Sequence, residues 1–587
     1  MWWPFSSHYP EQSLQFLRPQ YDYIVVGGGN AGCVLARRLS EGGKHTVLVV
    51  ERGDARDSFL DSTPLLGIHP LGGLKHTSVV ESAPIATLGD RSVSLACGSG
   101  LGGTTRINGG QYTCGVPAEF NSWNERGRKG WSYEDLKPYF RKSETWNGPV
   151  PEEYHGLDGR WPLNVRSFQG YFYGSSERAM AAAKSIGFLD ILDMHSPLEP
   201  SIGVNKMQFT IDPSGRRQSA FRAYLHGDFV KEHDNLHVCT KTSARKLEFS
   251  TADDGSIRAE GVELHSLDGR QRRVVTARRE IILSCGALHT PQLLLLSGIG
   301  PQDHLHEMGI RVVKDMPGVG AHFQDHVLVP TVYNCPLSDS LWAMVRQPTT
   351  LIREIYRYIR YGTGWFLCTF AEMEIFGLSS LVASDGRVPQ LTNSQLDSFN
   401  PKNISDFAVF CSPLADSGRL RYETKGLLGL MACLMQSKSV GRVRLRSSDP
   451  TDEPIFDMQY LTRSEDYTAL RAALRVTVAI AREMRAEGYE LDDSIVPDVS
   501  SDAALDEYIH KHASTMFHYS SSCRMAPEDD SEPGVVDDEL RVHGIPNLRI
   551  VDASIFPDVP ATHPSALIYA ISEKCADLVR QCASASG

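Results

Sequence analysis

The sequence predicts an α/β fold, and three observations near its start support that prediction. The run DYIVV, residues 22–26, ends in three β-branched residues, as in a parallel strand that is buried on both faces. Gly27, Gly29 and Gly32 follow in G-x-G-x-x-G spacing, ahead of apolar residues that recur at helical spacing. The run HTVLVV then leads to Glu51, about 19 residues after Gly32. Strand, glycine turn, helix, strand and acid together match the dinucleotide-binding fingerprint.

Each part of this fingerprint has a physical purpose. The first glycine permits the tight turn, the second lets the backbone approach a pyrophosphate, and the third lets the helix pack closely on the strand. The helix N-terminus faces the pyrophosphate, and Glu51 can accept hydrogen bonds from both ribose hydroxyls of an adenosine. The motif by itself fits FAD and NAD equally.

Length, charge and cysteine usage limit the class of protein. The chain has 587 residues, which indicates two or more domains, and a net charge of -12, which disfavours nucleic acid and anionic membrane as partners. No apolar run approaches the length of a membrane span. The 12 cysteines are scattered singly, without metal-ligand spacing, so no metal site is expected. The start, MWWPFSSHYPEQ, lacks the features of a signal peptide, and a cytoplasmic or otherwise intracellular protein is expected.

Further motifs occur in a fixed order along the chain. A second glycine-rich stretch covers residues 97–125, SCGALHTPQLLLLSGIGP covers residues 284–301, and PGVGAHFQDH covers residues 317–326. FHYSSSCRMAP and NLRIVDASIFPDVPATHPSALIYAISEKCADLV follow near the C-terminus. With these motifs the chain resembles the glucose–methanol–choline (GMC) family of FAD-dependent oxidoreductases, from about residue 21 to about residue 579.

The resemblance implies a GMC fold of two domains. A Rossmann-like FAD-binding domain would span residues 20–330, interrupted by insertions of the other domain, and residues 520–587 would complete it. Residues 331–520 would form the substrate-binding domain, whose antiparallel sheet roofs the flavin.

The resemblance also implies which residues hold FAD. An extended FAD needs close backbone approach at several points, which glycine-rich loops permit. Some relatives bond a histidine covalently to the flavin, but Arg106 and Ile107 occupy those positions here, so FAD is expected to bind non-covalently. Asp552 is expected near the cofactor, or else it merely caps a turn. The expected cofactor-binding residues are Gly27, Gly29, Asn30, Ala31, Gly32, Glu51, Arg52, Leu101, Gly103, Thr104, Thr105, Asn108, Gly109, Ala244, Asp552, Ala553, Pro564 and Ser565.

Two of the 20 histidines, His518 and His563, fall on the catalytic positions of the family. Oxidising a small or medium alcohol requires its hydroxyl proton to leave along with a hydride, and histidine is the side chain whose ordinary pKa suits such a base. His518 is the expected base. His563 would steady the developing alkoxide, and the helix that Pro564 begins would direct its positive end at the flavin.

Several alternatives stay open at this point. Electrons would pass from the flavin to dioxygen or to a quinone-type acceptor. Relatives of this fold include lyases, which also use histidine, and photodecarboxylases, which need no hydroxyl base. An NAD-dependent dehydrogenase would explain only the first motif.

Residues 349–362 predict a helix that ends at Gly362. Leu351, Ile355 and Ile359 share one face, and arginines and tyrosines lie between them. This pattern fits a helix that faces the core or a helix that lies on a membrane surface. The first is the expectation.

Overall fold

The computed structural model describes residues 9–68, 73–148, 154–157, 163–415 and 425–585. The expectation about a signal peptide rests in part on residues 1–8, which lie outside the described residues. Among the described helices, none combines the length and the apolar composition that crossing a bilayer requires.

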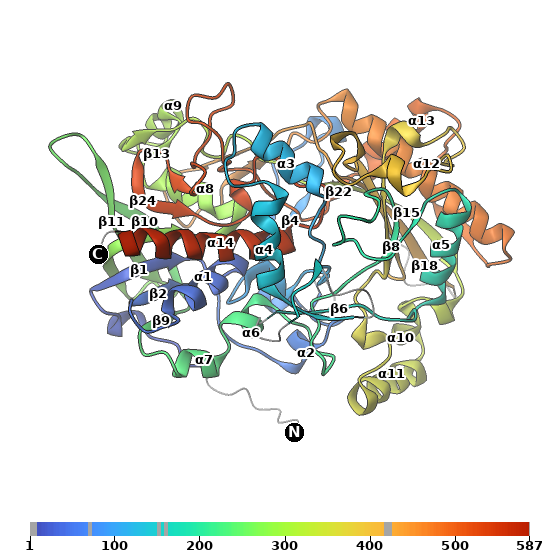
Figure 1. Ribbon diagram of the computed structural model, residues 1–587, viewed down its shortest axis with the longest axis horizontal. Helices are drawn as coiled ribbons and strands as arrows, with labels where there is room; N and C mark the ends of the chain where they lie inside the picture. Colours follow the sequence, from blue (N-terminus) through green and yellow to red (C-terminus); the bar gives the residue numbers. More distant parts are fainter. Residues whose placement is uncertain (1–8, 69–72, 149–153, 158–162, 416–424, 586–587) are drawn as a thin grey trace.

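A largely parallel sheet forms the left half of the molecule in Figure 1. Val26 at the end of one strand is in register with Val50 on one side and Leu283 on the other. Because parallel strands run the same way, their carboxyl ends meet at one edge. The parallel strands, in order across the sheet, are β24 (Ile545–Ile550), β12 (Arg272–Leu283), β1 (Gln20–Val26), β2 (Val47–Val50) and β9 (Leu236–Cys239).

Three antiparallel strands extend this sheet. The antiparallel β10 (Thr242–Thr251) and β11 (Ile257–Ser266) pair with each other, and β11 pairs with β12. The short β23 (Arg541–Val542) pairs with β24. The predicted strand, helix and strand are confirmed as β1, α1 (Asn30–Ser40) and β2.

Helix α1 packs against α14 (Pro564–Ala585), the helix expected after Pro564. A buried ion pair joins the two helices, in which Arg38 Nε lies 2.7 Å from Glu573 Oε2. Arg38 Nη1 also reaches Glu41 Oε1 at 2.8 Å. The ion pair therefore links the dinucleotide-type unit to a helix more than 500 residues later in the chain.

The second sheet is mostly antiparallel and lies in the right half of Figure 1. Its strands come from residues 190–206 as well as from residues 327–515, so the chain passes between the two sheets more than once. Helices α5 (Gly174–Ser185) and α12 (Ser464–Ala486) pack on it. The strands, in order, are β21 (Asp492–Ile495), β15 (Val327–Cys335), β18 (Gly426–Leu434), β17 (Phe407–Ser412), β16 (Met373–Gly377), β8 (Gly203–Lys206) and β7 (Asp190–Ile191), and β22 (Ser514–Thr515) pairs with β15.

The expected helix over residues 349–362 is present as α11 (Pro348–Tyr361) and ends at Gly362. The expectation that it faces the core is wrong. Leu351, Ile355 and Ile359 are all exposed, whereas Thr350, Glu354 and Tyr358 are buried. The apolar stripe of this helix therefore points to solvent.

Other helices and short strands lie around the two large sheets (Figure 1). The helices are α2 (Phe59–Ser62), α3 (Pro117–Glu125), α4 (Tyr133–Ser143), α6 (Ala220–Tyr224), α7 (Gly227–Lys231), α8 (Gly286–Leu296), α9 (Gln302–Glu307), α10 (Trp342–Arg346) and α13 (Asp502–His512). Short two-stranded sheets are formed by β3 (Thr77–Glu81) with β4 (Ser94–Gly98), β5 (Glu144–Asn147) with β6 (Leu163–Arg166), β13 (Ile299–Gly300) with β14 (Lys314–Asp315) and β19 (Arg442–Arg444) with β20 (Ile455–Asp457).

Removing one partner of the Arg38–Glu573 pair tests how strongly it joins α1 to α14. We expect E573A to destabilise the fold by about 3 kcal/mol, since the buried guanidinium of Arg38 loses the carboxylate that its Nε contacts. The thermal unfolding midpoint measures the effect. The double variant R38M/E573L removes both charges and should recover most of the loss. A midpoint of E573A equal to that of the unsubstituted protein would contradict this role.

Candidate active site

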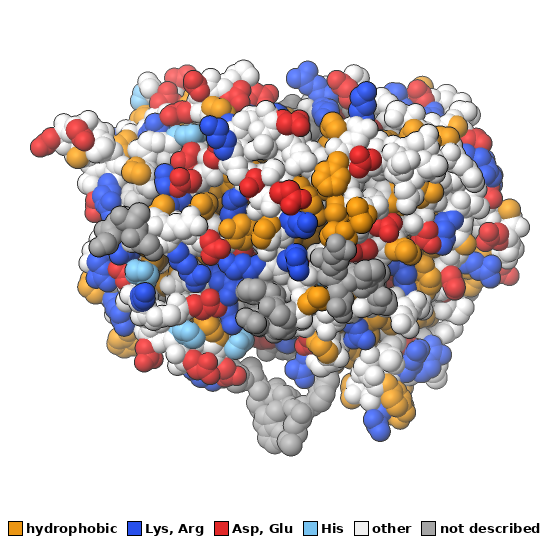
Figure 2. Space-filling model, in the orientation of Figure 1, with side chains coloured by type: hydrophobic (Ala, Val, Ile, Leu, Met, Phe, Trp, Pro, Cys, Tyr) orange, Lys and Arg blue, Asp and Glu red, His pale blue; other side chains and the backbone are white. Residues whose placement is uncertain are grey.

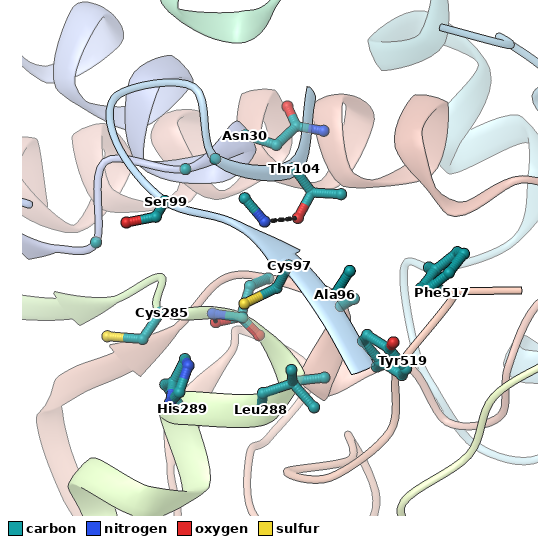
Figure 3. Close-up of a pocket in the computed structure, with 18 of the residues that line it drawn as sticks. Asn30, Ala96, Cys97, Ser99, Thr104, Cys285, Leu288, His289, Phe517 and Tyr519 are labelled. Atoms are coloured by element: carbon teal, nitrogen blue, oxygen red, sulfur yellow. Dashed lines mark hydrogen bonds between the residues drawn. The ribbon is translucent and has the colours of Figure 1, made fainter. Parts of the chain in front are cut away.

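A cavity of about 650 Å³ lies at the carboxyl edge of the parallel strands and extends to the second sheet. Gly27 follows β1, Glu51 follows β2, Ser284 follows β12 and Asp552 lies just beyond β24, and all four line the cavity. Figure 3 shows side chains from separate elements around it, among them Asn30, Thr104, His289 and Phe517. The site therefore forms where the topology of the sheet places ligands in open α/β folds.

Glycines keep the backbone bare at one end of the cavity. Gly27 has φ of 100°, and a Cβ there would lie 2.3 Å from the carbonyl oxygen of Ser284. A Cβ on Gly32 would lie 1.9 Å from the carbonyl oxygen of Gly27, which explains why helix α1 can pack so closely on β1. Gly29 has free space on its open side, and its backbone is accessible to a ligand.

The carboxylate of Glu51 holds three turns together. Its Oε2 accepts a hydrogen bond from the N–H of Gly28 at 2.8 Å, and its Oε1 accepts from Gly53 at 2.7 Å and from Gly100 at 3.1 Å. A carboxylate offers about four acceptor positions. At least one position, on Oε2, is left for a ligand, and that Glu51 accepts from both ribose hydroxyls stays a prediction.

The second glycine-rich stretch closes the same end of the cavity. A Cβ on Gly103 would lie 2.9 Å from the Cα of Gly29, and Thr104 Oγ1 accepts a hydrogen bond from the N–H of Gly98 at 3.1 Å. The side chain of Arg106 is buried beside Asp61, with its Nη2 3.7 Å from Asp61 Oδ2, and Arg106 does not line the cavity. The two glycine-rich turns are thus in direct contact.

Polar atoms in the cavity wall match a polar ligand such as a dinucleotide. In the described part of the chain, Asn30 Oδ1, Ser284 Oγ and His289 Nε2 are buried and have no hydrogen-bond partner. Buried polar atoms of this kind normally bind something. The bare glycine backbone and these unpaired atoms therefore fit an FAD molecule at this place.

Most of the expected site residues line the cavity, but two do not. Gly32 and Leu101 are buried beneath it, where Gly32 contacts Gly27 and Leu101 lies against Gly28. Asp552 both lines the cavity and caps a turn, since it accepts hydrogen bonds from the N–H groups of Gly286 and Ser554. The expected residues that line the cavity are Gly27, Gly29, Asn30, Ala31, Glu51, Arg52, Gly103, Thr104, Thr105, Asn108, Gly109, Ala244, His518, Asp552, Ala553, His563, Pro564 and Ser565.

The two expected catalytic histidines, His518 and His563, lie next to each other in the cavity wall. Their rings are arranged edge to face, with centroids 5.3 Å apart. A third histidine joins them. His326 Nδ1 lies 2.9 Å from His518 Nδ1, within hydrogen-bond distance. His563 Nδ1 lies 3.3 Å from Thr113 Oγ1 and 3.7 Å from Glu374 Oε2.

Burial keeps all three imidazoles neutral. It lowers the pKa of His563 to about 4 and that of His326 to about 3. Burial, together with the neighbouring His326 and His563, holds the pKa of His518 well below its usual value. Burial also raises the pKa of Glu374 to about 8, so this carboxyl carries a proton at neutral pH.

The loop that carries His518 is held by one buried carboxyl. Asp325 accepts hydrogen bonds from the backbone N–H of His518 at 2.8 Å, from Thr515 Oγ1 at 2.6 Å and from the Tyr460 hydroxyl at 2.5 Å. Phe517, just before the histidine, has a backbone φ of 63°, which residues other than glycine rarely adopt. Backbone strain of this kind is common beside reacting groups.

Sequence reasoning missed His326, Asp325 and the apolar wall of the cavity. His326 and Asp325 end the motif PGVGAHFQDH, which was identified without a role for either residue. The apolar wall comes from strands and loops of the second sheet, and no local pattern marks it. Its residues are Leu328, Phe370, Phe410, Leu414, Met431 and Met516, which pack in one hydrophobic cluster.

A separate buried group lies apart from the residues that line the cavity. Glu144, His155 and His195 bring ligand-type atoms within 4.8 Å of one another, although no sequence spacing indicated this. His155 Nδ1 lies 2.9 Å from Glu144 Oε1, and its Nε2 lies 3.2 Å from Asp193 Oδ2. These two carboxylates outweigh the effect of burial and raise the pKa of His155 to about 9. A protonated His155 therefore offsets one of the two carboxylate charges beside it.

Comparison with known proteins agrees with this arrangement. The chain is 34% identical over 567 residues to an oxygen-dependent choline dehydrogenase of Burkholderia vietnamiensis, covering 96% of this chain and 94% of that protein. An FAD-dependent oxidoreductase from Chaetomium thermophilum has a TM-score of 0.83 and 26% identity, covering 96% of this chain and 99% of that one. A fungal aryl-alcohol oxidase has a TM-score of 0.81 and 26% identity, with coverage of 96% and 99%.

Two family models for GMC oxidoreductases match the chain, over residues 21–328 and residues 437–572. Together with near full-length similarity to choline dehydrogenases, they show the fold and the cofactor. The chain belongs to the GMC oxidoreductases, FAD-dependent enzymes that oxidise CH–OH groups.

Proposed function

We propose that this chain oxidises a neutral, largely apolar alcohol to the aldehyde or ketone, with His518 as the base. The observation that carries the proposal is the contact between His518 and His326 at the wall of a glycine-lined cavity. A bound FAD supplies the acceptor for the hydride that leaves the carbinol carbon. The protein itself must hold the alcohol and remove its hydroxyl proton.

The hydrogen bond between the two Nδ1 atoms favours one tautomer for His518. Only one of the two Nδ1 atoms can carry the shared proton. The carbonyl groups of Met435 and Pro560 lie near the His326 ring and partly offset the lowering of its pKa. We assign the proton of His326 to Nε2, an atom without a hydrogen-bond partner in the described part of the chain, so that His326 Nδ1 is the acceptor. His518 then donates from Nδ1, and its Nε2 keeps a lone pair for the substrate proton.

The surroundings of His563 suit a group that positions the substrate oxygen. Thr113 Oγ1 and the protonated Glu374 lie on the Nδ1 side of its ring. The Nε2 atom is therefore the one that can serve the alcohol. Pro564 and Ser565, at the first turn of α14, also line the cavity, where the N–H groups of a helix start favour negative charge.

The apolar wall favours a neutral substrate. Among the residues that line the cavity, the acids are Glu51, Asp452, Glu453 and Asp552, and none belongs to the cluster of Met516 and Phe410. Arg52 lies 3.7 Å from Glu453, at the glycine-rich end. A quaternary ammonium group, such as that of choline, would find aromatic rings here but, among the described residues that form this wall, no carboxylate. A neutral aromatic or aliphatic alcohol would bury its carbon atoms against this wall.

Substituting His518 tests its role as the base. We expect H518N to slow the anaerobic reduction of the bound flavin by an alcohol about 10²–10⁴-fold, because the hydroxyl proton has no acceptor. Stopped-flow absorbance of the holoenzyme measures the rate constant. H306N, at an exposed histidine on α9, is the matched control and should leave the rate unchanged. Reduction by H518N at the unsubstituted rate would refute the assignment. If none of the alcohols bleaches the flavin, a non-redox reaction, such as that of a lyase with the same fold, would be favoured.

Substituting His326 tests whether its hydrogen bond orients His518 for accepting the substrate proton. We expect H326L to slow flavin reduction by roughly 10–100-fold, because His518 loses the acceptor that fixes its tautomer. H326N offers an amide oxygen near the same place and should retain more activity than H326L. Since the two histidines act together, H326L/H518N should be no slower than H518N alone. Fully multiplicative losses would argue against a shared proton.

The lowered pKa of His518 predicts the pH dependence of the reaction. A base whose pKa lies below 6.5 stays unprotonated as the pH falls past 6.5, so the acid limb of the reduction rate moves to lower pH. We expect the rate constant at saturating alcohol to stay level from about pH 8 to about pH 6.5 and to fall only below that. Stopped-flow reduction across this range measures it. An acid limb centred at or above pH 6.5 would contradict the burial argument.

A further inference from the structure

We propose that α10 and α11 form a docking surface for a membrane whose headgroups are anionic. Helix α11 has three separate faces. Thr350, Glu354 and Tyr358 recur every four residues and face the protein, whereas the apolar residues and the arginines lie on the remainder of its circumference. In Figure 1 this helix lies at the lower edge of the molecule, beside α10.

The buried face fixes the orientation of the helix. The Tyr358 hydroxyl donates to the carbonyl oxygen of Gly215 at 3.0 Å, and Glu354 Oε2 accepts from the N–H of Trp365 at 3.0 Å. Tyr358 also packs in the hydrophobic cluster that contains Phe366. The helix therefore cannot rotate to bury its apolar face without breaking these contacts.

The apolar side chains of α10 and α11 are largely exposed to solvent. Ile352 is 67% exposed, Tyr356 57% and Ile359 51%, and Val345 of α10 adds a further 71% exposed side chain. Contiguous apolar side chains of this kind mark contact surfaces. Figure 2 shows hydrophobic side chains beside basic ones at the lower right, where Figure 1 places α11.

The charge of this surface is opposite to that of the whole chain. Residues 342–361 contain four arginines and a single acid, Glu354, in a chain whose net charge is -12. Glu354 is buried and lies 3.0 Å from Arg353 and 3.2 Å from Arg357. The surface is therefore locally cationic, and arginines lie directly beside the apolar residues.

A bilayer surface fits this combination better than a second copy of the chain does. Interfacial helices place apolar residues among the acyl chains and keep arginines at the level of the headgroups. A symmetric contact between two copies would bring the same face of α11 together twice. Arg353, Arg357 and Arg360 of both copies would then meet, and the acid that α11 itself supplies to offset them is the buried Glu354.

Vesicle sedimentation of the holoenzyme tests the proposal. We expect binding to vesicles of phosphatidylcholine with phosphatidylserine, and much weaker binding to phosphatidylcholine alone. I352E/I359E should weaken binding at least about ten-fold, since it puts charges on the inserted face. R360Q should weaken it by about five-fold, and added salt should reduce that difference.

The control variant L198E/V274E places glutamates at two exposed apolar positions elsewhere on the surface and should bind like the unsubstituted protein. Flavin content and alcohol turnover of I352E/I359E should be normal, because neither side chain lines the cavity. Equal binding by I352E/I359E and the control, or no preference for anionic vesicles, would overturn the proposal. A dimer in lipid-free buffer that I352E/I359E dissociates would instead assign this face to a second copy.

Discussion

The carboxylate of Glu51 is the interaction on which the site depends. It accepts hydrogen bonds from three backbone N–H groups, those of Gly28, Gly53 and Gly100, which belong to three separate turns. Buried N–H groups must be paired, and here one side chain pairs groups from the turn after β1, from the turn after β2 and from the second glycine-rich stretch. The backbone at Gly29 and the backbone at Gly103 can then lie in contact and form one wall of the cavity. The cavity follows from that contact.

Chemistry at the other end depends on desolvation. The three imidazoles of His326, His518 and His563 lie in a buried region where a proton on any of them is costly. They stay neutral, His326 and His518 share a hydrogen bond, and Asp325 fixes the backbone of the loop that carries His518. A neutral, oriented imidazole can take a proton from an alcohol. The same burial that lowers its pKa also excludes the water that would compete.

Net charge and local charge differ in this molecule. The chain carries a net charge of -12, which on its own disfavours an anionic surface. Salt screens charges beyond about 10 Å, so a surface such as α11 is governed by the residues on it. Four arginines and one buried acid decide the sign there. An argument from total charge therefore does not extend to this helix.

The sequence alone determined the parallel sheet, the glycine cradle and the positions of His518 and His563, because each depends on local spacing or on an ordered family motif. It also placed α11 correctly, since helical periodicity is local. Only the tertiary structure decided which way that helix faces, because Glu354 and Tyr358 find their partners in other segments. The contact between His326 and His518, the apolar wall and the binding of Glu51 to three turns were likewise out of reach of the sequence. These contacts join residues that are distant along the chain, and no local pattern encodes which distant segments meet.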